Sequence, residues 1–243
     1  MIVVAMDVEE KAILKNIDFV SRSYGKKTPI VLKSFDLPRC KVTVTKSGIG
    51  LANASVHLAM IAELIDVDAI VLLGVGGALD EKLQVGDTVV AKQVIQHDSL
   101  ASANSRTHFI APGELTLSAS SDQQVDPVMK CDEVLMKWIR LGIESTHKGQ
   151  VYEGTLLSGS EFAASAKRKK ELRALEANAL MVDMEAAAFA QVARRLKIPF
   201  IAAKTVADRA NPEHSVAKDY VNFLSAATEH SEGLLHALLA TFK

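Results

Sequence analysis

The chain has 243 residues, of which 49% are hydrophobic and 23% are charged, and its formal net charge is −1. This length is enough to bury one large core, and an α/β domain of this size is common. The near-neutral charge excludes the strongly basic surface typical of nucleic-acid binding, so we expect no nucleic-acid partner. The one dense basic cluster, at 167–170, is expected to form the solvated face of a helix.

The two cysteines, Cys40 and Cys131, lie far apart and predict neither a disulfide framework nor a zinc site. A reducing cytoplasm is therefore the expected location. Residues 1–7 lack the basic leader of a signal peptide, and the apolar run 69–79 is too short to span a bilayer. We expect no membrane partner.

Hydrophobic patterning predicts a regular alternation of strands and helices. In chain order these are a strand over 2–5, a helix over 8–17, a strand over 41–45, a helix over 51–65, strands over 69–73 and 88–95, a helix over 127–141, a strand over 154–157, a helix over 166–175, a strand over 179–182, a helix over 185–196, a strand over 200–206 and a helix over 215–242.

The alternation predicts a single α/β domain over 1–243, a three-layer αβα sandwich around a central mixed, largely parallel sheet. Several strands lack polar alternation, as expected when both faces of a sheet are covered. Glycine-containing links at 47–50 and 74–77 are predicted at strand ends, where open α/β sheets bind ligands. The polar stretch 99–124 is expected to be a long surface loop.

Three carboxylates follow apolar, strand-like runs, namely Glu9, Glu185 and Asp208. Cleavage of a glycosidic bond requires a group that activates water, an acid for the leaving group and a group that holds the sugar. Each carboxylate also has a structural interpretation: Glu9 and Glu185 could open helices, and Asp208 could cap a turn. Taken together with the glycine turns, they favour an enzyme.

Other motifs are weak. The glycine run 74–77 lacks the Lys-Ser/Thr of a phosphate loop and the spacing of a dinucleotide fingerprint, so no cofactor is expected. His97 and Asp98 have no companion ligand cluster, and we expect no metal site. The chain also lacks a serine nucleophile elbow.

Six segments, in order and spacing, resemble the 5′-methylthioadenosine/S-adenosylhomocysteine nucleosidases of the nucleoside phosphorylase superfamily. They are Ala5-Met6-Asp7-Val8-Glu9, Lys46-Ser47-Gly48-Ile49-Gly50, Gly74-Val75-Gly76-Gly77 with Val85-Gly86-Asp87, Ser158-Gly159-Ser160-Glu161-Phe162, Val182-Asp183-Met184-Glu185-Ala186 and Ala207-Asp208. The resemblance implies a nucleoside phosphorylase-like fold and hydrolysis of the substrate's N-glycosidic bond, which releases adenine and the thioribose.

The resemblance also implies residue roles. Glu9 would be the general base for water, Asp208 would protonate the purine at N7, and Glu185 would hold the ribose hydroxyls. The implied substrate-binding residues are Ile49, Val75, Gly76, Phe162, Ala163, Met184 and Glu185; among them Met184 would lie against the ribose and Phe162 would stack on the base. A homodimer is expected, with helix 51–65 and its Ala52, Ala54, Ala59 and Ala62 at the interface.

The chain departs from the family pattern at Val75 and Ala207, where hydroxyl side chains are usual, and at Lys204, where arginine is common. The segment 101–109 differs from the family's usual 5′ pocket, and this pocket is expected to draw on the loop 99–113 instead. There Phe109 and Ile110 are expected to cover a thioether and Arg106 to pair with a charged substituent. The alternatives are a related purine nucleosidase such as a futalosine hydrolase, a phosphorylase, and a nucleoside-binding relative without turnover.

Overall fold

The computed structural model describes residues 1–27, 29–103, 106–112, 126–146 and 149–208. Its elements, in chain order, are β1 (Ile2–Val4), α1 (Asp7–Ile13), β2 (Val20–Tyr24), β3 (Ile30–Asp36), β4 (Lys41–Lys46), α2 (Leu51–Ala62), β5 (Ile70–Ala78), β6 (Thr88–Gln96), β7 (Leu100–Ala103), β8 (Arg106–Phe109), β9 (Val128–Lys130), α3 (Glu133–Thr146), β10 (Val151–Ser158), α4 (Ala166–Leu175), β11 (Ala179–Asp183), α5 (Ala186–Leu196) and β12 (Phe200–Asp208). The predicted helix over 215–242 lies outside the described residues.

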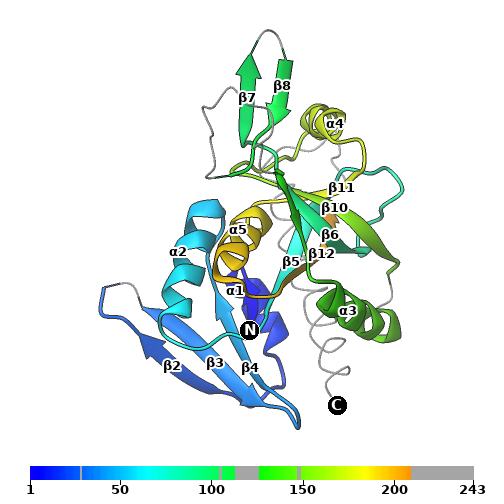
Figure 1. Ribbon diagram of the computed structural model, residues 1–243. Coiled ribbons are helices and arrows are strands. Elements are labelled where there is room, and N and C mark those ends of the chain that lie inside the picture. Colours follow the sequence, from blue (N-terminus) through cyan, green and yellow to red (C-terminus); the bar gives the residue numbers. More distant parts are fainter. Residues whose placement is uncertain (28, 104–105, 113–125, 147–148, 209–243) are drawn as a thin grey trace.

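The central sheet is mixed, and its strands run in the order β11-β10-β6-β12-β5-β1-β4-β3-β2, with β9 beside β6. β1 pairs in parallel with β4 and with β5, and β5 pairs in parallel with β12. β10 pairs in parallel with β6 and with β11. β11 additionally pairs with β5, which brings the far edge of the sheet back to its centre. Helices α2 and α5 lie side by side on one side of the central strands, and α3 lies on the other (Figure 1). This arrangement confirms the predicted α/β class.

The core follows from the composition of the central strands. Residues 70–76 of β5 and 200–207 of β12 are buried throughout, because helices cover both faces of the sheet. Phe189 of α5 is fully buried and packs in the same core as Leu72 and Ile201. The core therefore fixes the ends of β1, β5, β11 and β12 relative to one another. No described helix is long and apolar enough to cross a membrane.

Several predicted elements were wrong. The segment 127–132 is not helical: it contains β9, and α3 begins only at Glu133, because Asp132 accepts hydrogen bonds from the backbone N–H groups of Val134 and Leu135 at 3.0 and 2.8 Å. Residues 74–77 do not form a link, since they lie inside β5. β2 and β3 were not predicted, and β2 is largely exposed at the edge of the sheet.

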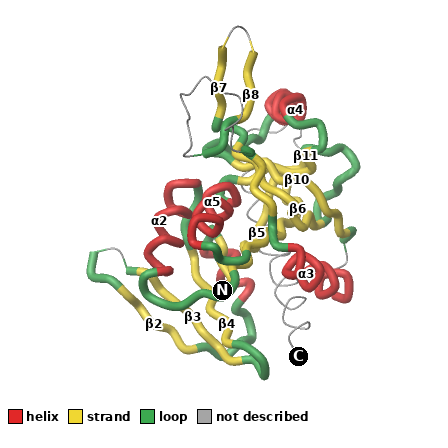
Figure 2. The backbone as a smooth tube through the Cα atoms, in the orientation of Figure 1, coloured by secondary structure: helices red, strands yellow, loops and turns green. Residues whose placement is uncertain are grey.

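The stretch 99–124 was predicted as a loop, but its first part forms the hairpin of β7 and β8. Figure 2 shows these two strands projecting from the rest of the molecule. Residues 113–125 lie outside the described residues. The hairpin leaves the sheet directly after β6, so it stands at the same end of the molecule as α4 (Figure 1).

Candidate active site

A cavity of about 640 Å³ opens where β1, β5, β11 and β12 end, and chain segments from six parts of the sequence form its wall. Carboxyl ends of parallel strands are where α/β sheets bind ligands. All the site residues predicted from the sequence line this cavity. The wall consists of Ala5, Met6, Glu9, Ile49, Val75, Gly76, Gly77, Glu161, Phe162, Ala163, Val182, Asp183, Met184, Glu185 and Asp208.

Glu9 is held in the first turn of α1 by backbone donors from the link that follows β1 and from β5. Its Oε2 accepts hydrogen bonds from the N–H groups of Ala5 and Met6, both at 2.9 Å, and its Oε1 accepts one from Val75 at 3.2 Å. Burial raises the pKa of Glu9, although Lys204 and the three N–H groups oppose that shift. A raised pKa makes a carboxylate a better proton acceptor, provided it is ionised.

The close approach of Glu9 to β5 requires a glycine. Gly74 has a φ of +152°, and a Cβ at this position would lie 2.7 Å from Oε1 of Glu9. Any side chain there would displace the carboxylate. The glycine run 74–77, which was predicted to be a turn, therefore lies in β5 and leaves space for the Glu9 carboxylate beside the strand.

Glu185 stands at the N-terminus of α5, directly after β11. Its Oε1 accepts a hydrogen bond from the N–H of Gly50 at 3.0 Å, and its Oε2 accepts one from Nζ of Lys204 at 3.3 Å. Burial raises the pKa of Glu185 to about 7, with Lys204 opposing the shift and Asp183 adding to it. The neighbouring Met184 lines the cavity, so this short segment supplies both a polar and an apolar surface.

Lys204, a residue of β12, is the buried cation of this region. Its Nζ lies 2.9 Å from Oδ2 of Asp183 and 3.3 Å from Oε2 of Glu185, and its side chain is 1% exposed. Asp183 and Glu185 raise the pKa of Lys204 against the effect of burial, so the lysine stays charged. Sequence reasoning noted Lys204 only as a replacement for arginine and assigned no role to Asp183; the strand-end position of Asp183 was the available signal.

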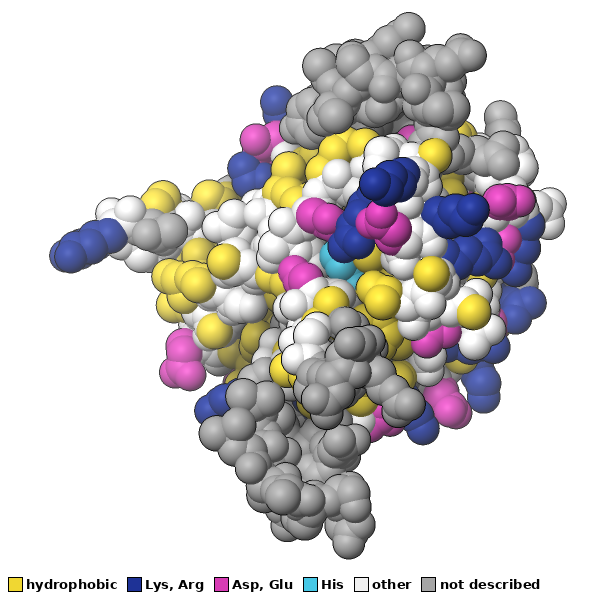
Figure 3. Space-filling model, turned by 90° about the horizontal axis from the view of Figure 1, so that it is seen from above, with side chains coloured by type: hydrophobic (Ala, Val, Ile, Leu, Met, Phe, Trp, Pro, Cys, Tyr) yellow, Lys and Arg dark blue, Asp and Glu magenta, His cyan; other side chains and the backbone are white. Residues whose placement is uncertain are grey.

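Asp208 ends β12 and also lines the cavity. Its Oδ2 accepts a hydrogen bond from Nζ of Lys169 at 2.6 Å. The prediction that the 167–170 cluster forms a solvated face was therefore wrong for Lys169, which is buried. Arg168 of the same cluster binds Glu161 at 2.8 Å. Viewed from above, Lys and Arg side chains stand beside Asp and Glu side chains (Figure 3).

Apart from Glu161, the side chains of the remaining wall are apolar. Val75 and Ala207, the two positions where hydroxyl side chains are usual, pack in one buried cluster with Ala5 and Met6. Val75 and Ala207 thus belong to one apolar cluster, and Val75 also lines the cavity. Phe162 is half-buried and belongs to the cavity wall, as does Ile49, which is 40% exposed.

The segment 99–113 was expected to form a 5′ pocket. In its described part, Phe109 packs against a small core cluster that contains Leu79 and Ile95, and neither Phe109 nor Ile110 belongs to the cavity wall. The side chains of Arg106 and His108 lie outside the described residues. The expectation that Phe109 and Ile110 line the cavity is thus not met, because the hairpin turns Phe109 toward the core beside β6.

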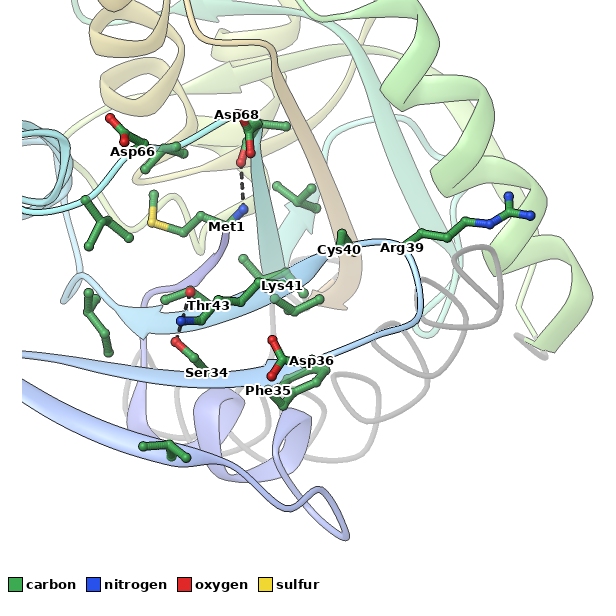
Figure 4. Close-up of a pocket in the computed structure, with 18 of the residues that line it drawn as sticks. Met1, Ser34, Phe35, Asp36, Arg39, Cys40, Lys41, Thr43, Asp66 and Asp68 are labelled. Carbon is green, nitrogen blue, oxygen red and sulfur yellow. Dashed lines mark hydrogen bonds between the residues drawn. The ribbon is translucent and has the colours of Figure 1, made fainter.

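A second cavity, of about 670 Å³, lies at the other end of β1 (Figure 4). Its wall includes Met1, whose amino group donates a hydrogen bond to the carbonyl of Ala69 at 2.7 Å. Burial lowers the pKa of this amino group to about 6. The cavity lies at the amino ends of parallel strands, where α/β folds seldom bind substrates, so it is not the candidate site.

Within the described residues, no group of three or more His, Cys, Asp or Glu side chains is arranged to hold a metal ion.

Comparisons with known proteins agree with this geometry. The family model described as the Phosphorylase superfamily matches residues 1–240. A 5′-methylthioadenosine/S-adenosylhomocysteine nucleosidase of Bacillus velezensis is 31% identical over 195 residues, which cover 80% of this chain and 79% of that protein. A nucleosidase of the same name from Staphylococcus aureus is 28% identical over 236 residues, covering 96% and 95% of the two chains.

Solved structures show the same fold. A Helicobacter pylori nucleosidase mutant with 5′-methylthioadenosine in its active site has a TM-score of 0.80 and 22% identity, covering 99% of this chain and 96% of that one. A mutant of the futalosine hydrolase of Helicobacter pylori has a TM-score of 0.77 and 22% identity, covering 98% and 97%. At these identities the structural likeness concerns the fold.

Proposed function

Because the chain belongs to the phosphorylase superfamily and, within it, to the 5′-methylthioadenosine/S-adenosylhomocysteine nucleosidases, we propose that it hydrolyses the N-glycosidic bond of 5′-thio-substituted adenosines. The products are adenine and the corresponding thioribose. The observation that carries the proposal is the meeting of Glu9, Glu185 and Asp208 in one cavity at the strand ends. Such a set supplies the base, the sugar-binding group and the acid that the reaction requires.

Glu9 activates the water. A carboxylate offers about four lone-pair positions, and three of them accept the N–H groups of Ala5, Met6 and Val75. The remaining position is available for one proton of a water molecule, whose oxygen then attacks the anomeric carbon. The three backbone donors fix the carboxylate, so little reorganisation accompanies the proton transfer.

Glu185 and Asp208 act on the two halves of the nucleoside. Glu185 accepts hydrogen bonds from the ribose hydroxyls, and these strengthen as positive charge develops on the sugar ring. Asp208 gives a proton to N7 of the purine, so that adenine leaves as a neutral molecule. Phe162 stacks on the base and Met184 contacts the ribose, while Ile49, Val75, Gly76 and Ala163 complete the binding surface.

Hydrolysis is favoured over phosphorolysis by the charge of the cavity. Among the described residues of its wall there is no lysine or arginine, and Lys204 behind the wall already contacts Asp183 and Glu185. A phosphate ion would meet carboxylates without a cation directed at it. Water, which Glu9 can deprotonate, is the better nucleophile for this surface.

The experiment that tests the proposal is release of free base from a panel of nucleosides, with and without phosphate. The panel contains 5′-methylthioadenosine, S-adenosylhomocysteine, futalosine and inosine. We expect adenine from the first two at a rate that phosphate does not change. Release only from futalosine, dependence on phosphate, or binding without release would each contradict the proposal and identify one of the alternatives.

We further propose that the protein is a cytoplasmic homodimer and that α2 forms part of its interface. Ala52, Val56 and Ala59 lie on one face of α2 and are exposed, with Val56 at 57%. Small and apolar side chains with this spacing permit close helix approach. Ala54, also expected at the interface, is instead buried inside the subunit, where α2 packs against α5.

A further inference from the structure

The ion pair between Lys169 and Asp208 has no place in the three-carboxylate mechanism. Nζ of Lys169 lies 2.6 Å from Oδ2 of Asp208 and 3.2 Å from the backbone carbonyl of the same residue. The two side chains are only 6% and 11% exposed. Lys167 and Lys170, its neighbours on α4, are exposed. Lys169 thus differs from these two lysines because it is buried and forms an ion pair.

The backbone of β5 is adapted to this pair. A Cβ at Gly77 would lie 3.1 Å from Nζ of Lys169, 3.3 Å from Cε and 3.6 Å from Oδ2 of Asp208. Gly77 is also the residue of β5 that pairs with Asp208 of β12, directly after a register shift that follows Val206. A bulge of this kind re-aims the side chain that follows it. The glycine and the shift together bring Asp208 to the lysine.

Lys169 approaches Asp208 from outside the substrate cavity. Asp208 lines the cavity of about 640 Å³, whereas Lys169 lines another cavity, of about 840 Å³, beneath α4. We call this space of about 840 Å³ the outer cavity. Its described wall consists of Ala78, Leu79, Asp80, Glu81, Ala166, Lys169, Lys170, Arg173, Ala174 and Ala177. The lysine can therefore contact the carboxyl group while a purine occupies the other side.

We propose that Lys169 is the positioning residue of the acid, which rests on the function proposed above. When the bond between the sugar and the purine breaks, its electron pair moves into the purine. The O–H bond of Asp208 breaks at the same time, and an N–H bond forms at N7. The ammonium of Lys169 keeps its three protons, holds Oδ2 in place and stabilises the carboxylate that remains. Solvent returns a proton to Asp208 after adenine has left.

The proposal has a definite kinetic consequence. The ammonium of Lys169 stabilises the negative charge that Asp208 acquires as its proton moves to N7. Removing the lysine should therefore slow proton transfer to the purine. The other ionisable groups around the pair, in the walls of the two cavities, are Glu9, Asp80, Glu81, Glu161, Lys170, Arg173, Asp183 and Glu185.

The test compares Lys169→Met with the matched control Lys167→Met, an exposed lysine on the same helix turn. With 5′-methylthioadenosine, Lys169→Met should lower kcat about tenfold. Lys169→Arg should restore most of this loss. Lys167→Met should behave as wild type. Lys169→Gln gives the same comparison if the methionine variant folds poorly, as thermal melting would show.

Two further arms separate positioning from a general structural effect. A 4-nitrophenyl 5-methylthioriboside needs no proton on its leaving group, so Lys169→Met should hydrolyse it at the wild-type rate. In an Asp208→Asn background, adding Lys169→Met should cause no further loss of adenine release. An unchanged kcat in Lys169→Met, or equal losses on both substrates, would overturn the inference. Absence of adenine release by the wild type would instead overturn the proposed function.

Discussion

At the scale of single residues, the cavity depends on a balance between buried charges. Lys204 lies within 3.3 Å of a Glu185 oxygen and 2.9 Å of an Asp183 oxygen, and all three side chains are almost completely buried. Removing one member of such a group leaves an uncompensated charge, which costs more than the pairing itself contributes. The charge of Lys204 therefore allows Asp183 and Glu185 to lie close together in a buried region.

Glu9→Gln should nearly abolish adenine release, because an amide cannot accept a proton from water. The expected loss in kcat is on the order of a hundredfold to ten-thousandfold. Glu10→Gln is the matched control: Glu10 is adjacent and also buried, but it forms an ion pair with Lys33 at 2.6 Å. Steady-state assays of both variants, with melting curves to verify folding, check the prediction. Comparable activity in the two variants would remove Glu9 from the role of base.

The raised pKa of Glu185 predicts a pH dependence of stability. Burial moves this pKa from 4.5 to about 7, so between these values the folded protein keeps a proton that the unfolded chain has released. The free energy of unfolding should therefore fall as pH rises through this interval, with the contribution of Glu185 complete below 4.5 and lost above about 7.

Glu185→Gln removes this titration. Urea unfolding of both proteins from pH 5 to pH 8 should show a decrease in stability that is smaller in the variant, by on the order of a few kcal/mol or less. Glu9 titrates in the same direction and remains in both proteins, so the difference belongs to Glu185. Parallel stability curves would show that Glu185 is already ionised in the folded protein at acidic pH.

At the scale of elements, β5 is the strand that organises the site. It pairs with β1 and β12 in parallel and with β11 in the antiparallel direction. Its glycines allow these neighbours to come close: a Cβ at Gly76 would lie 2.7 Å from Sδ of Met181 and 2.8 Å from the carbonyl of Val182. The end of β11, with Met184 and Glu185 behind it, is positioned by this contact.

Gly76→Ala should accordingly push β11 away from β5. Because the nearest backbone atom cannot rotate aside, we expect a loss of roughly 1–3 kcal/mol in stability. We also expect a higher KM for 5′-methylthioadenosine, since the segment proposed to bind the ribose follows β11. Urea unfolding and steady-state kinetics measure the two effects. Unchanged values of both would mean that the close contact of these strands is not required.

The sequence identified those parts of the site that depend on strand ends. Glu9, Glu185 and Asp208 each follow an apolar run, and strands of one sheet bring such positions to one edge. Lys169 could not be predicted in this way, because its contact with Asp208 depends on the tertiary placement of α4 rather than on helix periodicity. The strand β2 was missed because its residues are mostly polar and exposed. The strand β3 was missed because it is buried only at alternate positions at its start, Ile30 and Leu32, and so lacks the continuous apolar run of the central strands.

At the scale of the whole molecule, the proposed dimer predicts that α2 is sensitive to charge. Val56→Asp places a carboxylate on the exposed face of α2 and should convert the dimer to a monomer at micromolar concentration. Val134→Asp is the matched control, since Val134 is 55% exposed on α3, on the other side of the central strands (Figure 1). Sedimentation velocity distinguishes the two. Dimers in both variants, or a monomeric wild type, would contradict the assignment of α2.

The central claim is that water, activated by Glu9, is the nucleophile that reaches the sugar. It is tested most directly by turnover of 5′-methylthioadenosine in heavy-oxygen water with abundant phosphate, followed by mass spectrometry of the sugar product. We predict free methylthioribose with one heavy oxygen at the anomeric carbon, together with free adenine. A phosphorylated sugar without the label would contradict the account.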